Sequence, residues 1–394
     1  MNLLLDEWIT IQRRSGSVVK IAPIRLTANK NDPAVEILAP RADFSGALYQ
    51  FLISLLQTAF TPRDAREWQR RWKTPSEAVL HEALSPIVDA FEFDTDGPAF
   101  MQDFDLHTQD FIEIASLLVD APGDKTISIN KDHFVHRDRV RQVCYACAAT
   151  ALFTRQINAP SGGSGHDVSL RGGGPLTTRL IYEEAYANLW HKLWINVRPK
   201  NNLMERLNFS DNPSPNGTVF PWLAQARTSG PESGCETTPE TAHPLQVYWS
   251  MPWRIRLEFA DGEEGMCDLC GEVAERLVRR YQTMNYRVNY SGAWIHPLSL
   301  YDYNPNEERP SSVVEGHQYG VGCHRWLGLT QGNEKKMPVT SITVKHFNPQ
   351  YQPDNERQVQ LLEKQFCETP VQSRYYPADD CRCSCRGEKR RERW

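Results

Sequence analysis

The sequence lacks the features of membrane and secreted proteins. No apolar run approaches the roughly 20 residues that a membrane-spanning helix needs. The first residues, Met1 to Trp8, carry neither a basic segment nor a signal-peptide cleavage site. We therefore expect a cytoplasmic protein with no membrane partner.

Motifs of common enzyme classes are also missing. The eleven histidines include no H-E-x-x-H pair, and no serine lies in a nucleophile elbow. His133 and His136 follow Asp132 in a segment of mixed charge. Such a segment is typical of an exposed loop, although acid–base chemistry is an open alternative. No arrangement of residues points clearly to catalysis, so we expect a protein that is not an enzyme.

Charge and cysteine usage limit the remaining classes. The net charge is −5, so the chain is not basic as a whole. If it binds nucleic acid, it does so through a local patch or within an assembly. The ten cysteines in 394 residues do not suit a disulfide framework, which belongs to small secreted chains. Metal ligation and reduced thiols fit better.

Two Cys-x-x-Cys pairs carry the clearest chemical signal. They are Cys144 with Cys147 and Cys267 with Cys270. Two thiolates separated by two residues can bind one tetrahedral ion, and two such pairs complete a closed structural site with zinc as its metal. Redox activity, a disulfide in either pair, or buried unligated thiols are the alternatives. A shared zinc would cross-link distant parts of the chain.

The apolar pattern predicts a mixed α+β fold. Apolar residues recur at helical spacing within 43–59, which predicts a helix with one buried face. The pattern over 139–153 also predicts a helix, with Cys144 and Cys147 one turn apart on one face. Short alternating segments in the first forty residues predict strands. The length allows two or three domains, or one large domain with insertions.

Two segments have the composition of a nucleic-acid contact. Residues 161–174 contain six glycines, yet they match neither a P-loop nor a dinucleotide turn. Arg171 within them is a candidate phosphate contact, with a solvated turn arginine as the alternative. The stretch 276–288 is basic with interleaved tyrosines, and it suits either a phosphate backbone or the polar face of a helix.

Six motifs occur along the chain in a fixed order. They are Asn2-Leu-Leu-Leu-Asp-Glu-Trp-Ile, Asp96-Gly-Pro-Ala-Phe-Met-Gln, Cys144-x-x-Cys147 with Ala151-Leu-Phe, the run from Gly162 to Thr178, Cys267-x-x-Cys270-Gly, and Trp294-Ile-His-Pro297. Together they resemble CasA, the large subunit of the type I-E CRISPR surveillance complex Cascade. The resemblance runs from residue 1 to about residue 347.

The resemblance implies a function that composition alone does not. CasA-like proteins read the protospacer-adjacent motif in double-stranded target DNA, help to open the duplex, and present the complex to a helicase-nuclease. Guide RNA and the other Cascade subunits are the implied partners, and antiviral defence is the implied role. This division of labour suits RNA-guided recognition, in which base pairing reads the remaining sequence. A glycine loop suits the narrow minor groove.

The resemblance also carries over individual nucleic-acid-binding residues. The loop that contacts the guide end falls at Ile129 and Asn130. The family's lysine finger aligns with Asn285, so Arg287 or Arg280 is expected to supply the positive charge. The glycine loop comprises Ser161, Gly162, Gly163, Ser164 and Gly165.

The end of the chain departs from the family pattern. Family members continue into a Gln wedge and a C-terminal four-helix bundle, and neither is visible after Pro349. We therefore predict a CasA-like N-terminal domain over 1–349 with a structural zinc, and a divergent, disordered basic tail with cysteines over 350–394.

Two other functions are consistent with the sequence. A stand-alone zinc-stabilised nucleic-acid-binding protein would bind duplex DNA by itself with steep salt dependence, whereas a Cascade subunit would bind weakly until assembled. A metal-dependent hydrolase would lose activity on mutation of His133 or His136 and keep it after Cys270→Ala.

Overall fold

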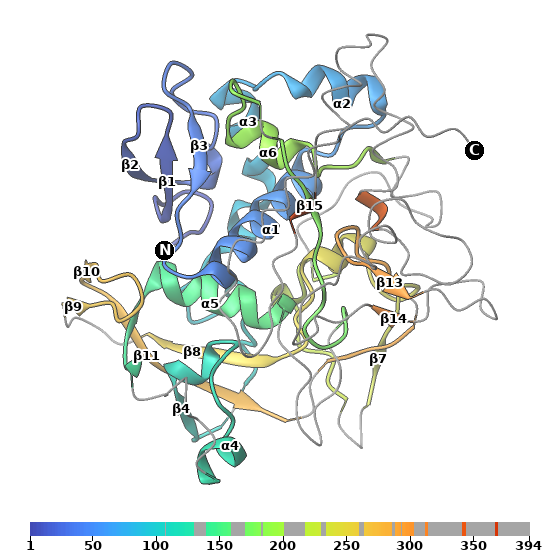
Figure 1. Ribbon diagram of the computed structural model, residues 1–394. Coiled ribbons are helices and arrows are strands. Elements are labelled where there is room, and N and C mark those ends of the chain that lie inside the picture. The colour runs from blue at the N-terminus through green and yellow to red at the C-terminus, as the bar shows by residue number, and fades with distance from the viewer. Residues whose placement is uncertain are drawn as a thin grey trace, which may run out of the picture.

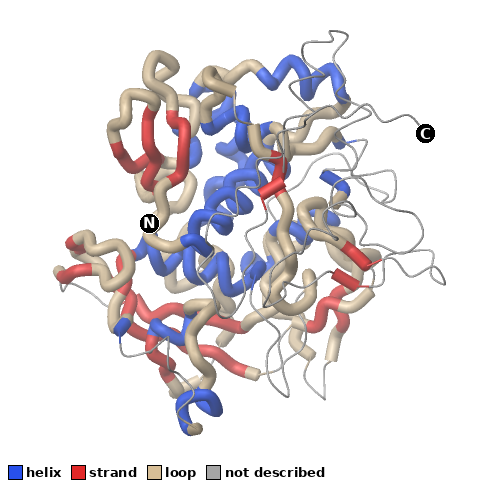
Figure 2. The backbone as a smooth tube through the Cα atoms, in the orientation of Figure 1, coloured by secondary structure: helices blue, strands red, loops and turns tan. Residues whose placement is uncertain are grey.

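The computed structural model describes thirteen stretches of the chain. They are residues 1–106, 108–129, 139–158, 170–182, 184–200, 217–229, 234–259, 264–285, 288–292, 294–302, 312–313, 341–343 and 367–368. Helices and strands are mixed within them, with helices gathered at the centre and strands around them (Figures 1 and 2). This mixture agrees with the predicted α+β class. None of the described helices has both the length and the apolarity needed to cross a membrane.

The helices fall into two kinds, α-helices and short 3₁₀ turns. The α-helices are α1 (Ala42–Ala59), α2 (Ala65–Trp72), α3 (Glu77–Leu84), α4 (Asp124–Ser128), α5 (Tyr145–Asn158) and α6 (Leu189–Trp194). The 3₁₀ helices are η1 (Pro23–Arg25), η2 (Ser85–Phe91), η3 (Ile114–Leu117), η5 (Pro221–Leu223) and η6 (Pro244–Tyr248).

The strands are short and form several separate sheets. The larger ones are β1 (Ile9–Arg13), β2 (Val18–Ile21), β3 (Ala34–Ile37), β4 (Phe111–Glu113), β8 (Arg254–Phe259) and β11 (Leu277–Met284). The two-residue strands are β5 (Val143–Cys144), β6 (Arg179–Leu180), β7 (Glu236–Thr237), β9 (Gly265–Met266), β10 (Val273–Ala274), β12 (Asn289–Tyr290), β13 (Tyr301–Asp302), β14 (Ser312–Val313) and β15 (Cys367–Glu368).

Helix α1 is the centre of the core, and the prediction of a helix over 43–59 is confirmed. The expectation of one buried face was wrong, because residues 47–58 are all buried and the helix is covered on every side. It packs against α5 and α6. Phe51 is 1% exposed. Five aromatic rings meet it edge to face, those of Trp8, Phe91, Phe100, Phe153 and Trp249.

Strand β11 organises the four-stranded sheet. It pairs with β8 along one side and with β4 and then β5 along the other, all antiparallel. Leu277 lies opposite Cys144, whereas Gln282 lies opposite Phe111. The start of β11 therefore meets the start of α5, and its middle meets the strand that leads toward α4 (Figure 1).

Two of the predictions from the pattern were wrong in detail. Helix α5 begins at Tyr145 rather than at Arg139, and Cys144 lies on β5. The basic stretch 276–288 contains strand β11 and not the polar face of a helix. In both segments sheet pairing decides the backbone conformation, because it links residues far apart in the sequence.

The segment after residue 349 is described at only two residues. Cys367 and Glu368 form β15 and pair with Leu180 and Arg179 of β6. A disordered tail was expected over 350–394, and these two residues are instead paired with the folded part of the chain (Figure 1).

A candidate metal centre and nucleic-acid contacts

Four cysteine sulfurs converge on one point. The sulfurs of Cys144, Cys147, Cys267 and Cys270 all lie within 4.8 Å of one another, and the first three residues are buried. The Sγ atoms of Cys144 and Cys270 are 3.8 Å apart. A tetrahedron of thiolates about 2.3 Å from a zinc ion has edges of about 3.8 Å. The spacing thus fits a tetrahedral four-thiolate metal site.

Sheet pairing explains why two pairs so distant in sequence meet. Cys144 ends β5 and Cys147 lies in the first turn of α5. Cys267 and Cys270 lie in the turn between β9 and β10, and β11 follows directly. Because Leu277 of β11 pairs with Cys144, the turn is held beside the strand–helix junction.

The second pair lies in a tight turn with its own backbone hydrogen bonds. The Cys267 N–H donates to the Glu272 carbonyl at 2.8 Å, and the Gly271 N–H donates to the Cys267 carbonyl at 2.9 Å. Gly271 has a φ of +73°, a conformation that glycine adopts without the penalty of a side chain. The turn can therefore present both sulfurs on one side.

Asp268, between the two cysteines, fastens this turn to the two residues just before β5. Its Oδ2 accepts from the backbone N–H groups of Arg141 at 2.7 Å and Gln142 at 3.0 Å. The Asp268 N–H in turn donates to the Gln142 carbonyl at 3.0 Å. This role was not predicted, although an aspartate inside a Cys-x-x-Cys turn is visible in the sequence.

The thiols share hydrogen bonds that change their acidity. Hydrogen bonds from Cys144 and Cys147 lower the pKa of Cys267 well below its usual range. The pKa of Cys147 is raised because its sulfur lies against those of Cys144 and Cys267. Bringing four thiolates together concentrates negative charge, which a bound cation relieves.

Lys20, on strand β2, is a charged group that interacts with this cluster. Its ammonium pairs with Glu272, the residue that accepts from Cys267. Burial lowers the pKa of Lys20, but the hydrogen bond to Glu272 and the charges of Cys144 and Cys270 outweigh it, so the net pKa is raised. Lys20 therefore offsets part of the negative charge of the cluster.

Arg280 lies on β11 with its side chain exposed, and Asn285 lies just after the end of this strand. The Arg280 guanidinium makes a bidentate ion pair with Glu258, with both distances at 2.7 Å, and lies over the Phe111 ring. Its charge is thus already matched by a carboxylate. Asn285 follows β11 and is exposed. Asn285 follows Leu277, the β11 residue that pairs with Cys144, by eight residues. At about 3.3 Å per residue of strand, Asn285 is therefore about 26 Å from the end of β11 beside the cysteine cluster.

Ile129 is the only guide-contact candidate among the described residues. It ends α4 and is 50% exposed, which is unusual for an isoleucine. Helix α4 lies in the connection between β4 and β5, below the sheet in Figure 1. The other candidates, together with His133 and His136, lie outside the described residues: Asn130, Ser161, Gly162, Gly163, Ser164, Gly165 and Arg287.

Arg171 is not at the surface, so the expectation of a phosphate contact or a solvated turn arginine there was wrong. It is 1% exposed. Its guanidinium donates to four side-chain oxygens, those of Ser299, Gln50, Asn158 and Thr177. Gln50 and Ser299 are more than a hundred residues away in the sequence, so local spacing does not indicate that the side chain is used inside the fold.

Comparison with protein families identifies the chain. The family model for CRISPR-associated protein Cse1 matches residues 2–363. The chain belongs to the Cse1 family. The match passes the predicted domain boundary at residue 349 and takes in part of the expected tail.

Solved structures agree with the Cse1 fold. Thermus thermophilus CasA (Cse1) superposes with a TM-score of 0.59 at 18% identity, over 88% of this chain and 66% of that one. Cse1 from Acidimicrobium ferrooxidans gives 0.57 at 15% identity, over 87% and 62%. A chain of a CRISPR RNA-guided surveillance complex gives 0.63 at 12% identity, over 93% and 71%. The chain thus spans under two thirds of the length of the first two proteins.

Proposed function

We propose that the chain is the large subunit of a type I-E CRISPR RNA-guided surveillance complex. The observation that carries this proposal is the Cse1 family match over 2–363, together with the fold similarity to a chain of such a complex. The other Cascade subunits and the guide RNA would be its partners. Within the complex it would read the protospacer-adjacent motif in duplex DNA, assist opening and recruit the helicase-nuclease.

Zinc is the metal that we propose for the four-cysteine site. Four sulfurs and tetrahedral spacing favour zinc over oxygen-seeking cations. All four positions are taken by protein, so the ion would hold the fold and would not activate water. It would anchor the starts of α5 and β11, the elements that lead to the glycine loop and to Asn285.

Co-purification tests the assembly. The chain is co-expressed with a guide RNA and the smaller subunits of a type I-E complex from the same genome. We expect all of them to elute together in size exclusion with guide RNA. Elution of this chain alone, beside an otherwise complete complex, would contradict the proposal. Tight, salt-sensitive duplex binding by the isolated chain would favour the stand-alone alternative.

The glycine loop is tested in the assembled complex. Gly163→Phe should weaken binding to duplex DNA that carries the recognised motif, because a bulky side chain prevents close approach of the backbone to the groove. Assembly should be unchanged. Ser17→Phe, at an exposed position between β1 and β2, is the matched control. Equal DNA affinity of both variants and the parent would refute the assignment of the loop.

A further inference from the structure

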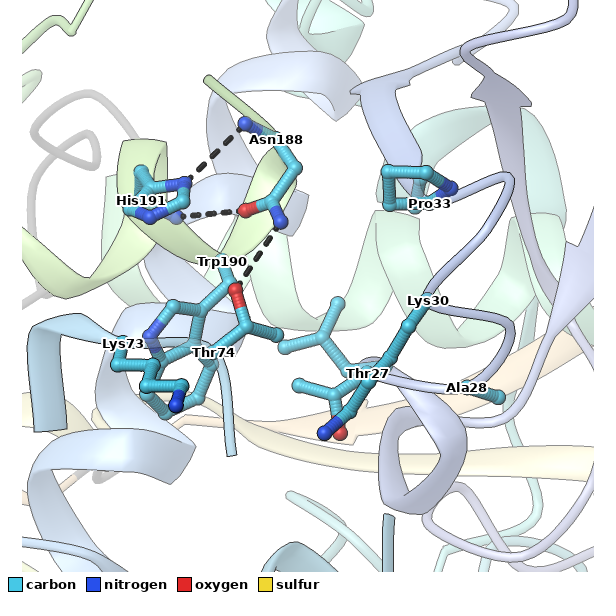
Figure 3. A pocket seen from close by; sticks show the side chains of 11 residues that line it. Thr27, Ala28, Lys30, Pro33, Lys73, Thr74, Asn188, Trp190 and His191 are labelled. Carbon is cyan, nitrogen blue, oxygen red and sulfur yellow. Dashed lines mark hydrogen bonds between the residues drawn. The ribbon is translucent and has the colours of Figure 1, made fainter. Parts of the chain in front are cut away.

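A cavity whose lining contains none of the four cysteines has no role in the function proposed above. It has a volume of about 290 Å³. Its walls come from three segments: the chain after η1, the link between α2 and α3, and the start of α6. Its lining is mostly apolar. Figure 3 shows Lys73 and Lys30 on the two sides of the cavity, with Thr74 and Thr27 between them.

One wall is held rigid by hydrogen bonds and ring stacking. The Asn188 side chain caps α6 by accepting from the His191 N–H at 3.2 Å, and its Nδ2 donates to Thr74 Oγ1 at 3.1 Å. Trp190 also lines the cavity, and its ring stacks on Trp194 with centroids 5.0 Å apart. A ligand would therefore meet a preformed surface, as is usual for small-molecule sites.

A buried hydroxyl in the cavity lining has no partner. Thr27 is 5% exposed, and its Oγ1 makes no hydrogen bond within the described part of the chain. Burial of an unpaired hydroxyl is unfavourable, so such a group in a native protein calls for a partner. A ligand with a polar edge that reaches Thr27 would supply it.

Among the described residues that line the cavity, only Lys30 and Lys73 carry a full charge, and both are positive. Lys30 and Lys73 are exposed, and neither pairs with a carboxylate of the described residues. Burial, reinforced by the charge of Arg14, lowers the pKa of His191 to about 4, so its ring is neutral at physiological pH. The two ammonium groups together match the charge of a terminal phosphate, close to −2 at neutral pH.

We propose that this cavity binds a nucleoside phosphate, either free or as one unstacked nucleotide of a single strand. The flat base would enter the apolar cavity, its polar edge would pair with the Thr27 hydroxyl, and the phosphate would lie between Lys30 and Lys73. A bare phosphate would leave the apolar space unfilled, and an aliphatic acid would leave Thr27 unpaired. Splayed bases held against aromatic side chains are a common mode of single-strand recognition. The site does not depend on membership in the surveillance complex.

Calorimetric titration of the full chain tests the ligand class. Adenosine and uridine 5′-monophosphates should bind at least about tenfold more tightly than ribose 5-phosphate or inorganic phosphate, because only the former fill the cavity. Equal affinity for ribose 5-phosphate would overturn the proposal. Short single-stranded RNA forms the second arm: tighter binding than the monophosphates indicates a strand as the source, and weaker binding indicates the free nucleotide.

Variants locate the site. Thr27→Val keeps the side-chain shape and should weaken nucleotide binding about 3- to 10-fold by removing one hydrogen bond. The pair Lys30→Glu and Lys73→Glu should weaken it at least about tenfold. Arg66→Glu with Arg70→Glu changes the net charge equally on exposed positions of α2 outside the cavity, and it should have little effect.

Two results would contradict the location. One is an equal loss in the Arg66 and Arg70 control, which would mean that binding follows net charge alone. The other is unchanged binding by Thr27→Val with an unchanged melting curve. Photocrosslinking with 4-thiouridine monophosphate provides a direct readout, because the label should attach to the peptide that contains Thr27 or the one that contains Trp190.

Discussion

Two regions of the molecule differ in how much apolar surface they bury. One is the cysteine cluster, where β5, α5 and the turn between β9 and β10 meet. The other is the tryptophan stack of α2 and α6, which consists of Trp68, Trp190 and Trp194. At the junction, strands β9 and β10 have two residues each, and Met266 and Val273 on them are 59% and 62% exposed. In the stack, Trp68, Trp190 and Trp194 are nearly fully buried. Indole N–H groups fix their positions, as where Trp194 donates to the Trp68 carbonyl at 3.1 Å.

This difference in buried apolar surface indicates where a bound metal is needed for stability. A two-stranded hairpin with exposed apolar residues is marginally stable by itself. The tryptophan region buries large rings, each of which contributes several kcal/mol through burial and packing. A metal-bound cysteine cluster can replace that apolar contribution where the chain has too few apolar residues to build a core. The two regions should therefore respond differently to the same perturbations.

The largest effect is expected from Cys267→Ser. Loss of one thiolate opens the site, and structural zinc contributes about 10–16 kcal/mol of binding free energy in zinc-finger peptides. We expect loss of bound zinc, destabilisation by several kcal/mol, and fast amide exchange over residues 264–274. Metal analysis and hydrogen exchange measure these. Cys235→Ser, at a cysteine outside the cluster, should retain zinc. Loss of zinc in both variants, or in neither, contradicts the site.

Trp194→Ala should have the next largest effect. It should lower the free energy of unfolding by about 3–5 kcal/mol, because it leaves a cavity between Phe60, Trp68 and Trp190. Zinc content should stay at the parent level. Chemical denaturation measures the loss of stability, and metal analysis of the same sample measures the zinc content. If this variant also lost its zinc, the two regions would not be independent, and the contrast drawn between them would fail.

A fall in pH should lower the free energy of unfolding because of His191, which lies on α6 beside the tryptophan stack. Its pKa in the folded chain is about 4, below about 6.5 in the unfolded chain, so between these values the unfolded chain binds more protons. The stability associated with the neutral His191 ring is fully present above pH 6.5 and is lost as the pH falls toward 4. Without screening it would change stability by about 2 kcal/mol at pH 5, and solvent at this half-buried ring reduces that to about 1 kcal/mol.

The control is His191→Gln, which retains a side chain able to cap α6. Stability measured between pH 7 and pH 5 should fall less steeply in this variant than in the parent. Identical slopes would mean that His191 does not titrate in this range.

The smallest effect is expected from Lys20→Ala. The Lys20–Glu272 ion pair is largely exposed, so the free energy of unfolding should change by less than about 1 kcal/mol. Zinc affinity should nevertheless fall, because a positive charge near Cys144 and Cys270 is removed. Competition with a chelator measures it. Lys73→Ala, on the tryptophan side, should leave zinc affinity unchanged, and an equal decrease would count against a local effect of Lys20.

The sequence predicted the parts of the fold that depend on local spacing. The 43–59 helix followed from apolar periodicity, and the four cysteines followed from two-residue spacing. What joins distant segments was not predictable. Cys144 lies on a strand because it pairs with Leu277, and Arg171 is buried because Gln50 and Ser299 receive its hydrogen bonds.

The nucleic-acid contacts were less predictable still. Arg280 looked like a free basic residue, yet Glu258 on the neighbouring strand β8 neutralises it. Only sheet register brings these two side chains together, since Tyr281 pairs with Leu257 and Gln282 with Arg256. A basic residue in a sequence is therefore a candidate for phosphate only after its neighbours in the sheet are known.

X-ray absorption at the zinc edge, on the purified and reduced full chain, tests the central claim most directly. Four sulfur ligands at about 2.3 Å and one zinc per chain are the predicted result. A chain without metal, or a metal held by nitrogen or oxygen ligands, would contradict a cysteine-bound ion at the junction of β5, α5 and β11.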